Sequence, residues 1–293
     1  MIYSIRLTIT HLYNQPAANS RHLIRVLPKT IANRQHLTTH LLQVFPEPDA
    51  RSETVDFFET TSMACAHTDF HAEMSIRLAC HVEVFPPARW LDLSPDVEQL
   101  CREWQASCDL SARSPVHFLG PSPRLQPDPA ITGFARDLFD PSQSTAANVI
   151  RLGQALHDLM TFDATATHVD TEAPEAFALR RGVCQDFSHI MILALQALGI
   201  PAAYVSGYLR TIPPPGQARL EGADATHAWV MLWCGPETGW IGLDPTNDLI
   251  VADDHIVTAT GRDYADVSPL DGVLVGPGSQ KLDVKVDVVP ATS

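Results

Sequence analysis

Basic residues are scarce in this chain of 293 residues, where 20 Lys and Arg stand against 34 Asp and Glu and the formal net charge is −14. Nucleic-acid binding depends on a clustered surplus of Lys and Arg, so this balance argues against that class of partner. No run of 18 apolar residues occurs, so no segment is built as a membrane-spanning helix. The N-terminal residues 1–10 alternate like a strand and lack the basic start and apolar block of a signal peptide. We therefore expect a cytoplasmic protein with no nucleic-acid or membrane partner.

Cysteine is present without a pairing pattern. The six cysteines, at positions 65, 80, 101, 108, 184 and 234, include no CxxC pair. Neither a structural zinc site nor a disulfide framework is indicated, and free thiols are expected in a reducing compartment. A Walker loop, a GxSxG motif and an HExxH motif are also missing. The sequence predicts no metal and no cofactor, and the question becomes whether one cysteine carries chemistry.

The first 90 residues have the pattern of a small all-β domain. Short apolar runs are separated by prolines in residues 1–90, which predicts an N-terminal antiparallel β-sandwich. With 45% hydrophobic and 18% charged residues, the chain can form one or two globular domains. The expected strands are 3–11, 23–27, 41–44, 54–58, 71–78 and 82–85.

Residues 91–293 change to helical spacing and predict a catalytic core of α+β class, helical over about 91–200 and β over about 201–293. The proline-rich stretch 212–223 is expected to be a surface loop and a candidate wall or lid of a site. The expected helices follow Ser94 and cover 131–139, 145–160, 171–182 and 184–199. The expected strands are 202–211, 227–233, 240–243 and, at the end of this domain, 282–289.

Three residues of the second domain can act together: Cys184 at a helix start, His227 in a strand and Asp244 at the end of the next strand. Unpaired N–H groups and the dipole at a helix start favour a thiolate, and the same N–H groups could hold an oxyanion. A thiolate nucleophile needs a base, and the base needs a group that fixes its tautomer. A hairpin register that pairs His227 with Asp244 would place both side chains on one face of the sheet.

Each of these residues alone has a simpler explanation. Free cysteine is among the most buried residue types, so Cys184 alone is more often structural than nucleophilic. His227 alone would be a strand histidine, and Asp244 before a proline would be a turn residue. The combination favours a Cys-His-Asp arrangement of the kind used in thiol acyl transfer.

The segments around these residues read Arg181-Gly-Val-Cys184-Gln-Asp-Phe-Ser-His, His227-Ala-Trp-Val and Gly239-Trp-Ile-Gly-Leu-Asp244-Pro-Thr-Asn. They closely resemble the transglutaminase-like superfamily in its bacterial form. The resemblance implies a papain-like core in which Cys184 matches the nucleophile, His227 the base and Asp244 the orienting carboxylate. Residues 1 to about 85 look like the β-rich domain that precedes the core in these bacterial proteins.

One departure from the family concerns the oxyanion donor. Animal transglutaminases are understood to use an upstream tryptophan, and this chain has no tryptophan between Trp104 and Trp229. Loss of one such donor typically costs two to three orders of magnitude in rate, so another group is needed. Gln185, Asp186 and Trp229 are candidate oxyanion or site-shaping residues.

Two further groups of residues are interpreted as structural. The alternating residues His67, Asp69, His71 and Glu73 are expected to form a solvated strand face, because no second cluster completes a metal site. Cys101 and Cys108 are seven residues apart on a predicted helix and are expected to pack in its apolar stripe.

The predicted activity is thiol-dependent hydrolysis of a peptide or amide bond in a peptide or protein substrate. Three alternatives remain: amine transfer by a protein-glutamine gamma-glutamyltransferase, acyl transfer as in arylamine N-acetyltransferases, and a non-catalytic peptide-binding module on the same fold. Between His227 and Gln280 acidic residues outnumber the single Arg262, which favours neutral or cationic substrates.

Overall fold

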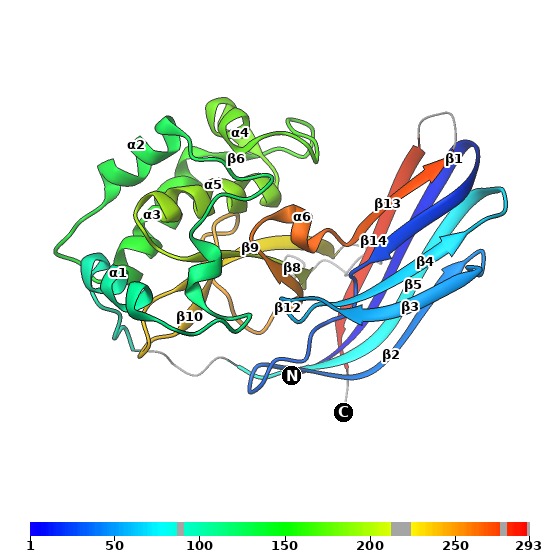
Figure 1. Cartoon of the computed structure of the whole chain (residues 1–293), viewed down its shortest axis with the longest axis horizontal. Helices are drawn as coiled ribbons and strands as arrows, with labels where there is room; N and C mark the ends of the chain where they lie inside the picture. The colour runs from blue at the N-terminus through cyan, green and yellow to red at the C-terminus, as the bar shows by residue number, and fades with distance from the viewer. Residues whose placement is uncertain (87–90, 212–223, 276–279, 292–293) are drawn as a thin grey trace, which may run out of the picture.

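The computed structural model describes residues 1–86, 91–211, 224–275 and 280–291. The N-terminal domain is a 7-stranded antiparallel sheet of order β2-β5-β1-β4-β3, in which β13 and β14 also pair with β1 (Figure 1). Its strands are β1 (Ile2–Ile24), β2 (Gln35–Phe45), β3 (Ala50–Val55), β4 (Thr61–His67), β5 (His71–Val84), β13 (Leu270–Val275) and β14 (Gln280–Pro290).

The long strand β1 joins the two halves of this sheet. Its first half pairs with β5 and β14, and its second half pairs with β4 and β13, with an irregularity between Leu12 and Ala17. The alternation of β1 places Tyr3, Ile5 and Leu7 in the same apolar core as residues of β4 and β5. The halves thus enclose one core, and the predicted fold class of a β-sandwich followed by an α+β core is confirmed.

The C-terminal strands lie in a different place from the prediction. The segment 282–289 was expected to complete the second domain, but β14 pairs with β1 from Tyr3 opposite Pro290 to Tyr13 opposite Gln280. Val286 and Val288 are buried in the N-terminal core. The physical reason is that both halves of β1 present an edge to be paired, and alternating valines on β14 need an apolar face to cover. The N-terminal domain therefore contains both ends of the chain.

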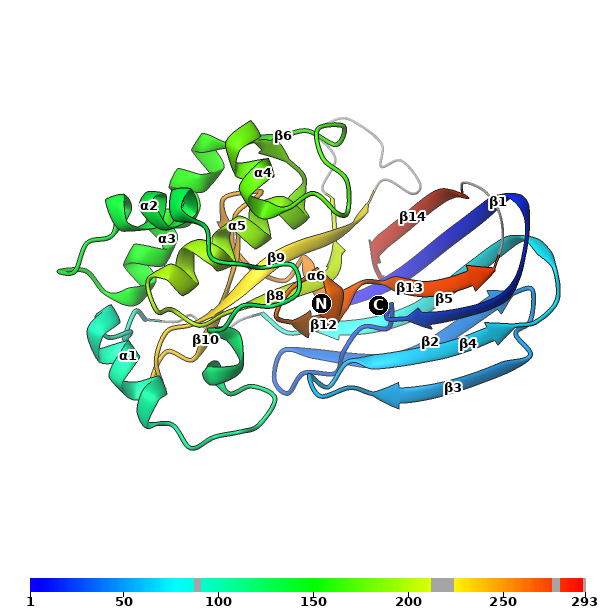
Figure 2. The same ribbon diagram turned by 45° about the horizontal axis from the view of Figure 1, so that its top comes forward.

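Helices cover one face of the second sheet (Figure 2). The helices are α1 (Val97–Ala106), η1 (Pro115–Phe118), α2 (Pro129–Leu138), α3 (Thr145–Leu159), α4 (Ala173–Leu179), α5 (Cys184–Ala197) and α6 (Tyr264–Val267). In α5 every residue from Gln185 to Leu195 is buried, since it packs against α2, α3 and α4 as well as β8 and β9. Within the described ranges, no helix is both long and apolar enough to cross a membrane.

The second sheet is antiparallel and has the order β11-β10-β9-β8-β12. Its strands are β8 (Ala202–Leu209), β9 (Ala225–Trp233), β10 (Trp240–Asp244), β11 (Leu249–Ile250) and β12 (His255–Gly261), and a separate pair is formed by β6 (Thr161–Phe162) and β7 (Arg181–Gly182). Tyr204 and Val230 face the helical core, whereas Tyr208 and Ile256 belong to the core of the N-terminal domain. The sheet therefore connects the two cores.

Candidate active site

Cys184 is the first residue of α5 and is half-buried. The helix start is fixed by Asp186, whose Oδ2 accepts hydrogen bonds from the Val183 backbone N–H at 2.8 Å and from the Thr167 hydroxyl at 2.7 Å. A Cβ at Gly182 would collide with the Asp186 carboxylate, so glycine is required there. Asp186 thus fixes the first turn of α5, where Cys184 lies.

His227 and Asp244 are in direct contact, with 2.8 Å between His227 Nε2 and Asp244 Oδ2. Both residues are buried, His227 being 9% exposed and Asp244 fully enclosed. His227 also contacts the thiol of Cys184, and because Nε2 bonds to the carboxylate, Nδ1 is the ring nitrogen available for that contact. The structure therefore brings the three predicted residues together from α5, β9 and β10.

The register of β9 and β10 differs from the prediction by two residues. The predicted hairpin paired His227 with Asp244, but the observed pairs are Trp233 with Trp240 and Met231 with Gly242. Side chains on a strand alternate with a period of two, so a slip of two residues keeps every side chain on its face. The imidazole reaches the carboxylate diagonally and not from the directly opposite position.

Asp244 accepts hydrogen bonds on both oxygens. Oδ1 accepts from the backbone N–H groups of Thr246 and Asn247, at 3.0 and 3.2 Å. Oδ2 accepts from His227, from His255 Nε2 at 3.1 Å and from Asn247 Nδ2 at 2.7 Å. Burial alone would raise the pKa of Asp244, but these hydrogen bonds outweigh burial and hold that pKa well below its usual range. The carboxylate is therefore kept as an anion.

The electrostatics of His227 follow from that anion. Burial acts to lower the pKa of His227, but the hydrogen bonds to Asp244 and to the Cys184 thiol, with the charges of both groups, raise it to about 10. An imidazolium is thus favoured beside the sulfur. This arrangement can support a thiolate–imidazolium pair, which is the reactive form of a cysteine nucleophile.

The other two predicted residues have different surroundings. The amide of Gln185 donates to the carbonyl of Val169 at 2.9 Å, which ties α5 to the loop before α4. This bond uses one of the two N–H groups of the amide. Trp229 is fully buried and stacks on His227, with ring centroids 6.2 Å apart and an angle of 29°. Its indole excludes water from one side of the imidazole, which is a site-shaping role.

Sequence reasoning missed His255 and Asn247, the two further donors to Asp244. His255 begins β12, a strand that was not predicted, although the run Ile256-Val-Thr-Ala-Thr is rich in β-branched residues. Asn247 follows the Asp244-Pro-Thr turn and was available in the motif. A search for polar side chains just after the predicted carboxylate would have found Asn247, but nothing local to His255 indicates its contact.

The side chains of His227, Asp244 and His255 could supply three metal ligands, because one ligand atom from each lies within 4.8 Å of the others. These atoms already satisfy one another by hydrogen bonds. A metal-bound His255 would need a partner for its second ring N–H. His255 Nδ1 is buried and has no hydrogen-bond partner in the described part of the chain. The donor set therefore suits a hydrogen-bonded arrangement better than a metal.

Three smaller predictions need correction. His67 and His71 do not share a strand face, because a turn separates β4 from β5; both are buried, with ring centroids 5.0 Å apart. Asp69 is exposed in that turn. Cys108 lies beyond the end of α1 and is exposed, so it does not pack in the apolar stripe.

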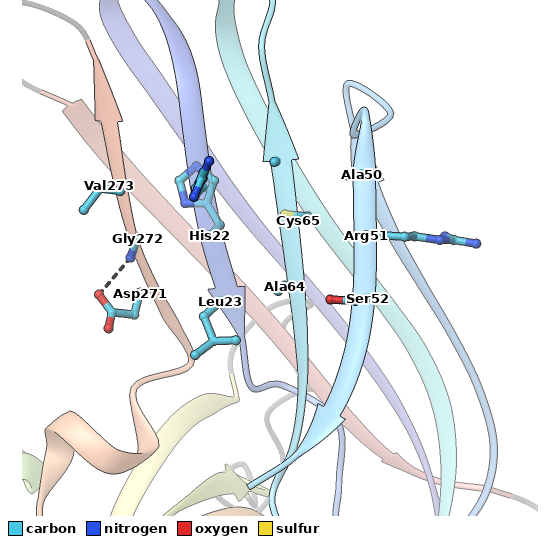
Figure 3. A pocket seen from close by; sticks show the side chains of 12 residues that line it. His22, Leu23, Ala50, Arg51, Ser52, Ala64, Cys65, Asp271, Gly272 and Val273 are labelled. Carbon is cyan, nitrogen blue, oxygen red and sulfur yellow. Dashed lines mark hydrogen bonds between the residues drawn. The ribbon is translucent and has the colours of Figure 1, made fainter.

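A hollow of about 500 Å³ lies along β13, β1, β4 and β3 of the N-terminal sheet, and Figure 3 shows its lining. Several lining residues, such as Ala50, Ser52 and Ala64, have small side chains, which leaves space above this part of the sheet. None of the three candidate catalytic residues lines it. The predicted lid segment 212–223 lies outside the described residues.

Two family models match the chain: the transglutaminase-like superfamily over residues 132–245 and the bacterial transglutaminase-like N-terminal region over residues 3–83. The chain belongs to the transglutaminase-like superfamily. The first model ends one residue after Asp244, so it includes all three candidate catalytic residues.

Relatives cover nearly the whole chain. Uncharacterized proteins of Mycobacterium tuberculosis and Mycobacterium bovis are 38% identical over 88% of this chain and 83% of their own length. A protein-glutamine gamma-glutamyltransferase of Pseudomonas aeruginosa is 38% identical over 29% of this chain and 13% of its own. A crystal structure from Cytophaga hutchinsonii, described as a candidate cysteine protease, covers 100% of this chain and 92% of its own with a TM-score of 0.75 and 23% identity. That likeness establishes the shared fold.

Proposed function

We propose that the protein is a thiol-dependent acyl-transfer enzyme that hydrolyses a peptide or amide bond. The observation that carries the proposal is the buried His227–Asp244 pair at 2.8 Å, in which His227 also contacts Cys184, the first residue of α5. The raised pKa of His227, about 10, favours the imidazolium that a thiolate needs as its partner. Cys184 is half-buried, which leaves its sulfur within reach of a substrate.

The chemistry divides into two steps. The Cys184 thiolate attacks the carbonyl carbon, a C–S bond forms, and the C–N bond breaks as His227 gives its proton to the leaving amine. Water then loses a proton to His227 and attacks the thioester, which releases the acid and restores the thiolate–imidazolium pair. Asp244 stays ionised throughout and holds the imidazole in one orientation.

The oxyanion needs at least two donors. The Cys184 backbone N–H lies in the first turn of α5, where N–H groups have no partner within the helix. One N–H of the Gln185 amide is bonded to Val169, and its second N–H and the backbone groups of the neighbouring segments are the candidates for the second donor.

A second function is favoured by the similarity to the Pseudomonas gamma-glutamyltransferase. The first step is the same in both reactions, and an amine in place of water takes the acyl group in the second. A non-catalytic peptide-binding module is a weaker alternative, because it has no need of a buried charged pair. The peptide or protein partner and residence in the cytoplasm remain predictions from sequence.

The test is a peptide-library digest followed by mass spectrometry, run with and without a primary amine. Hydrolysis gives new termini in both samples, whereas amine transfer adds the mass of the amine to a glutamine-containing peptide. The matched control is Cys184→Ala, which should remove every product. Products that persist with Cys184→Ala, or no products with the parent on any library, would contradict the proposal.

A further inference from the structure

His255 shares the carboxylate of Asp244 with His227. It is the first residue of β12 and is 3% exposed, and its Nε2 lies 3.1 Å from the same oxygen that His227 contacts. The rings of the two histidines have centroids 6.1 Å apart. One buried oxygen thus joins two imidazoles, of which the proposed reaction uses one.

The two imidazoles differ at their second nitrogen. A hydrogen bond from His255 to the carboxylate requires a proton on Nε2, and His255 Nδ1 is buried without a hydrogen-bond partner in the described residues. A lone pair is tolerated there more easily than an unpaired N–H, so the neutral Nε2–H tautomer fits. His227 instead contacts the thiol of Cys184 in addition to the carboxylate. His255 can therefore hold the carboxylate while His227 moves the proton.

A glycine of β8, Gly207, lies in the sheet between the strands that carry His255 and His227. β8 lies between β12 and β9, and Gly207 of β8 pairs with His227. A Cβ at Gly207 would meet the Trp229 ring and the carbonyl of Ile256, the neighbour of His255. The Trp229 ring contacts His255 edge-on, with centroids 5.0 Å apart. The missing side chain thus makes room for the Trp229 ring, which packs against both histidines.

The N-terminal domain holds the beginning of β12. Gln35 is 1% exposed, and its side chain bonds to both backbone groups of Val257: Nε2 donates to the carbonyl and Oε1 accepts from the N–H, each at 2.8 Å. The Lys29 backbone N–H donates to the same carbonyl at 2.9 Å. The Gln35 side chain therefore makes the two hydrogen bonds to Val257 that a neighbouring strand would make. Val257 is two residues from His255.

The segment before His255 is held by the same domain. The Tyr3 hydroxyl donates to Asp254 Oδ1 at 2.8 Å, and Arg34 Nη2 donates to the carbonyl of Ala252 at 2.5 Å. Residues 252–257 thus contact the N-terminal domain on both sides of His255.

We infer that His255 is a positioning residue that holds Asp244 in place for His227, and that the N-terminal domain fixes His255 through Gln35. The inference rests on the proposed function, because it assigns His255 a part in the activation of Cys184. It also gives the N-terminal domain a role in the active site that requires no contact with substrate.

The test measures the rate at which iodoacetamide alkylates Cys184 from pH 5 to 10, with the modified residue located by mass spectrometry and exposed Cys108 as the internal control. The parent should react at pH 6 far faster than Cys108. His255→Phe should slow Cys184 by about 10-fold at pH 6, by analogy with the loss of about 10-fold or more when a group that orients a metal-ligating residue is removed. The rates should converge by about pH 9 to 10, where a thiolate forms without help from an imidazolium. His255→Gln keeps a donor near the Nε2 position and should restore most of the rate.

Two variants examine the connection between the domains. Gln35→Leu should give the pH profile of His255→Phe with a smaller loss, because it releases Val257. Arg25→Met removes a different contact between the domains, from Arg25 Nη1 to the carbonyl of Ser268, and should leave the profile unchanged. Thermal unfolding of each variant identifies any that do not fold, and His255→Met replaces His255→Phe if the ring is not accepted.

The outcomes separate the two proposals. If the parent shows enhanced reactivity at pH 6 and the apolar variants of His255 keep it, the positioning role is wrong and the proposed function stands. If Cys184 of the parent reacts like Cys108 at every pH, the thiolate–imidazolium pair is absent and both proposals fail. A Gln35→Leu profile identical to that of the parent would overturn the role of the N-terminal domain.

Discussion

Both domains bury histidines, but the pKa values of His227 and His22 shift in opposite directions. In the core, His227 contacts the carboxylate of Asp244, and its pKa rises to about 10 against the effect of burial. In the N-terminal domain, burial together with the nearby His11, His67 and His71 lowers the pKa of His22 to about 4. At neutral pH the first is favoured as a cation and the second as a neutral ring.

The difference shows what a buried carboxylate does to a buried base. Desolvation penalises the charged imidazole in both places, and at His227 the hydrogen bonds and charges of Asp244 and Cys184 outweigh it. That anion is itself maintained by donors, including His255 and Asn247. A buried histidine that stays charged in this fold therefore needs a group of supporting residues, whereas His22, buried among other histidines, is favoured as a neutral ring.

The largest expected effect comes from removing the anion. Asp244→Asn should reduce turnover of a peptide found in the digest by about four orders of magnitude, because the imidazole loses its orientation and its charge partner. The pKa of His227 should then fall below about 10, because only Cys184 remains to oppose the effect of burial. Asp248→Asn, at an exposed residue of the same turn, is the matched control. A rate within 10-fold of the parent would remove Asp244 from the catalytic machinery.

Low pH should reduce the free energy of unfolding, because His22 is neutral in the folded protein. Its folded pKa of about 4 lies below the ordinary value of 6.5, so between these pH values the unfolded chain binds a proton that the folded chain does not. Stability from this group is complete above pH 6.5 and is lost as pH falls to about 4, by about 3 kcal/mol.

The check on His22 is urea unfolding of the parent and of His22→Gln at pH 7 and pH 4. The parent should lose more stability between the two pH values than the variant does. His40→Gln, at an exposed histidine of β2, should behave like the parent. Equal losses for the parent and His22→Gln would show that this histidine is not neutral when folded.

A carboxylate placed beside His22 should raise the pKa of this histidine, as Asp244 does for His227 in the core. Cys65 pairs directly with His22 across β4 and β1 and is buried. Cys65→Asp should raise the pKa of His22 by about 1 to 3 units, since an opposite charge at such range favours the cation. Cys65→Ser adds a polar group without charge and should leave the pKa near 4. Titration of the His22 ring protons by NMR measures both, and equal values would contradict the explanation of the difference between the domains.

The sequence predicts on which face of a strand each side chain lies, but it does not predict which residues of the neighbouring strand lie opposite. The alternation at His227, Trp229 and Met231 assigned these side chains to the face of Asp244, and that held although the register is shifted by two residues. Register depends on turn geometry, which the short Gly235-Pro-Glu-Thr-Gly239 connection does not specify by composition.

Contacts between segments far apart in the sequence could not be predicted from the local pattern of residues. The residues of β14 have clear strand alternation, but nothing within that segment indicates that β1, more than 260 residues away in sequence, is its partner. His255 was missed for the same reason, because its contact with Asp244 depends on how β12 is held by β8 and Gln35. Helix starts were easier, since α3 begins at Thr145 after Ser144, whose side chain accepts from the Ala147 N–H.

The most direct test of the charged site is an NMR spectrum of the parent at pH 7 that correlates ring nitrogens and carbon-bound ring protons of ¹⁵N-labelled histidines. Variants His227→Gln and His22→Gln assign the two signals. The predicted result is a ring protonated on both nitrogens for His227 and a neutral ring for His22. A neutral His227 at pH 7 would contradict the account, because the carboxylate of Asp244 would then fail to hold the imidazolium that activates Cys184.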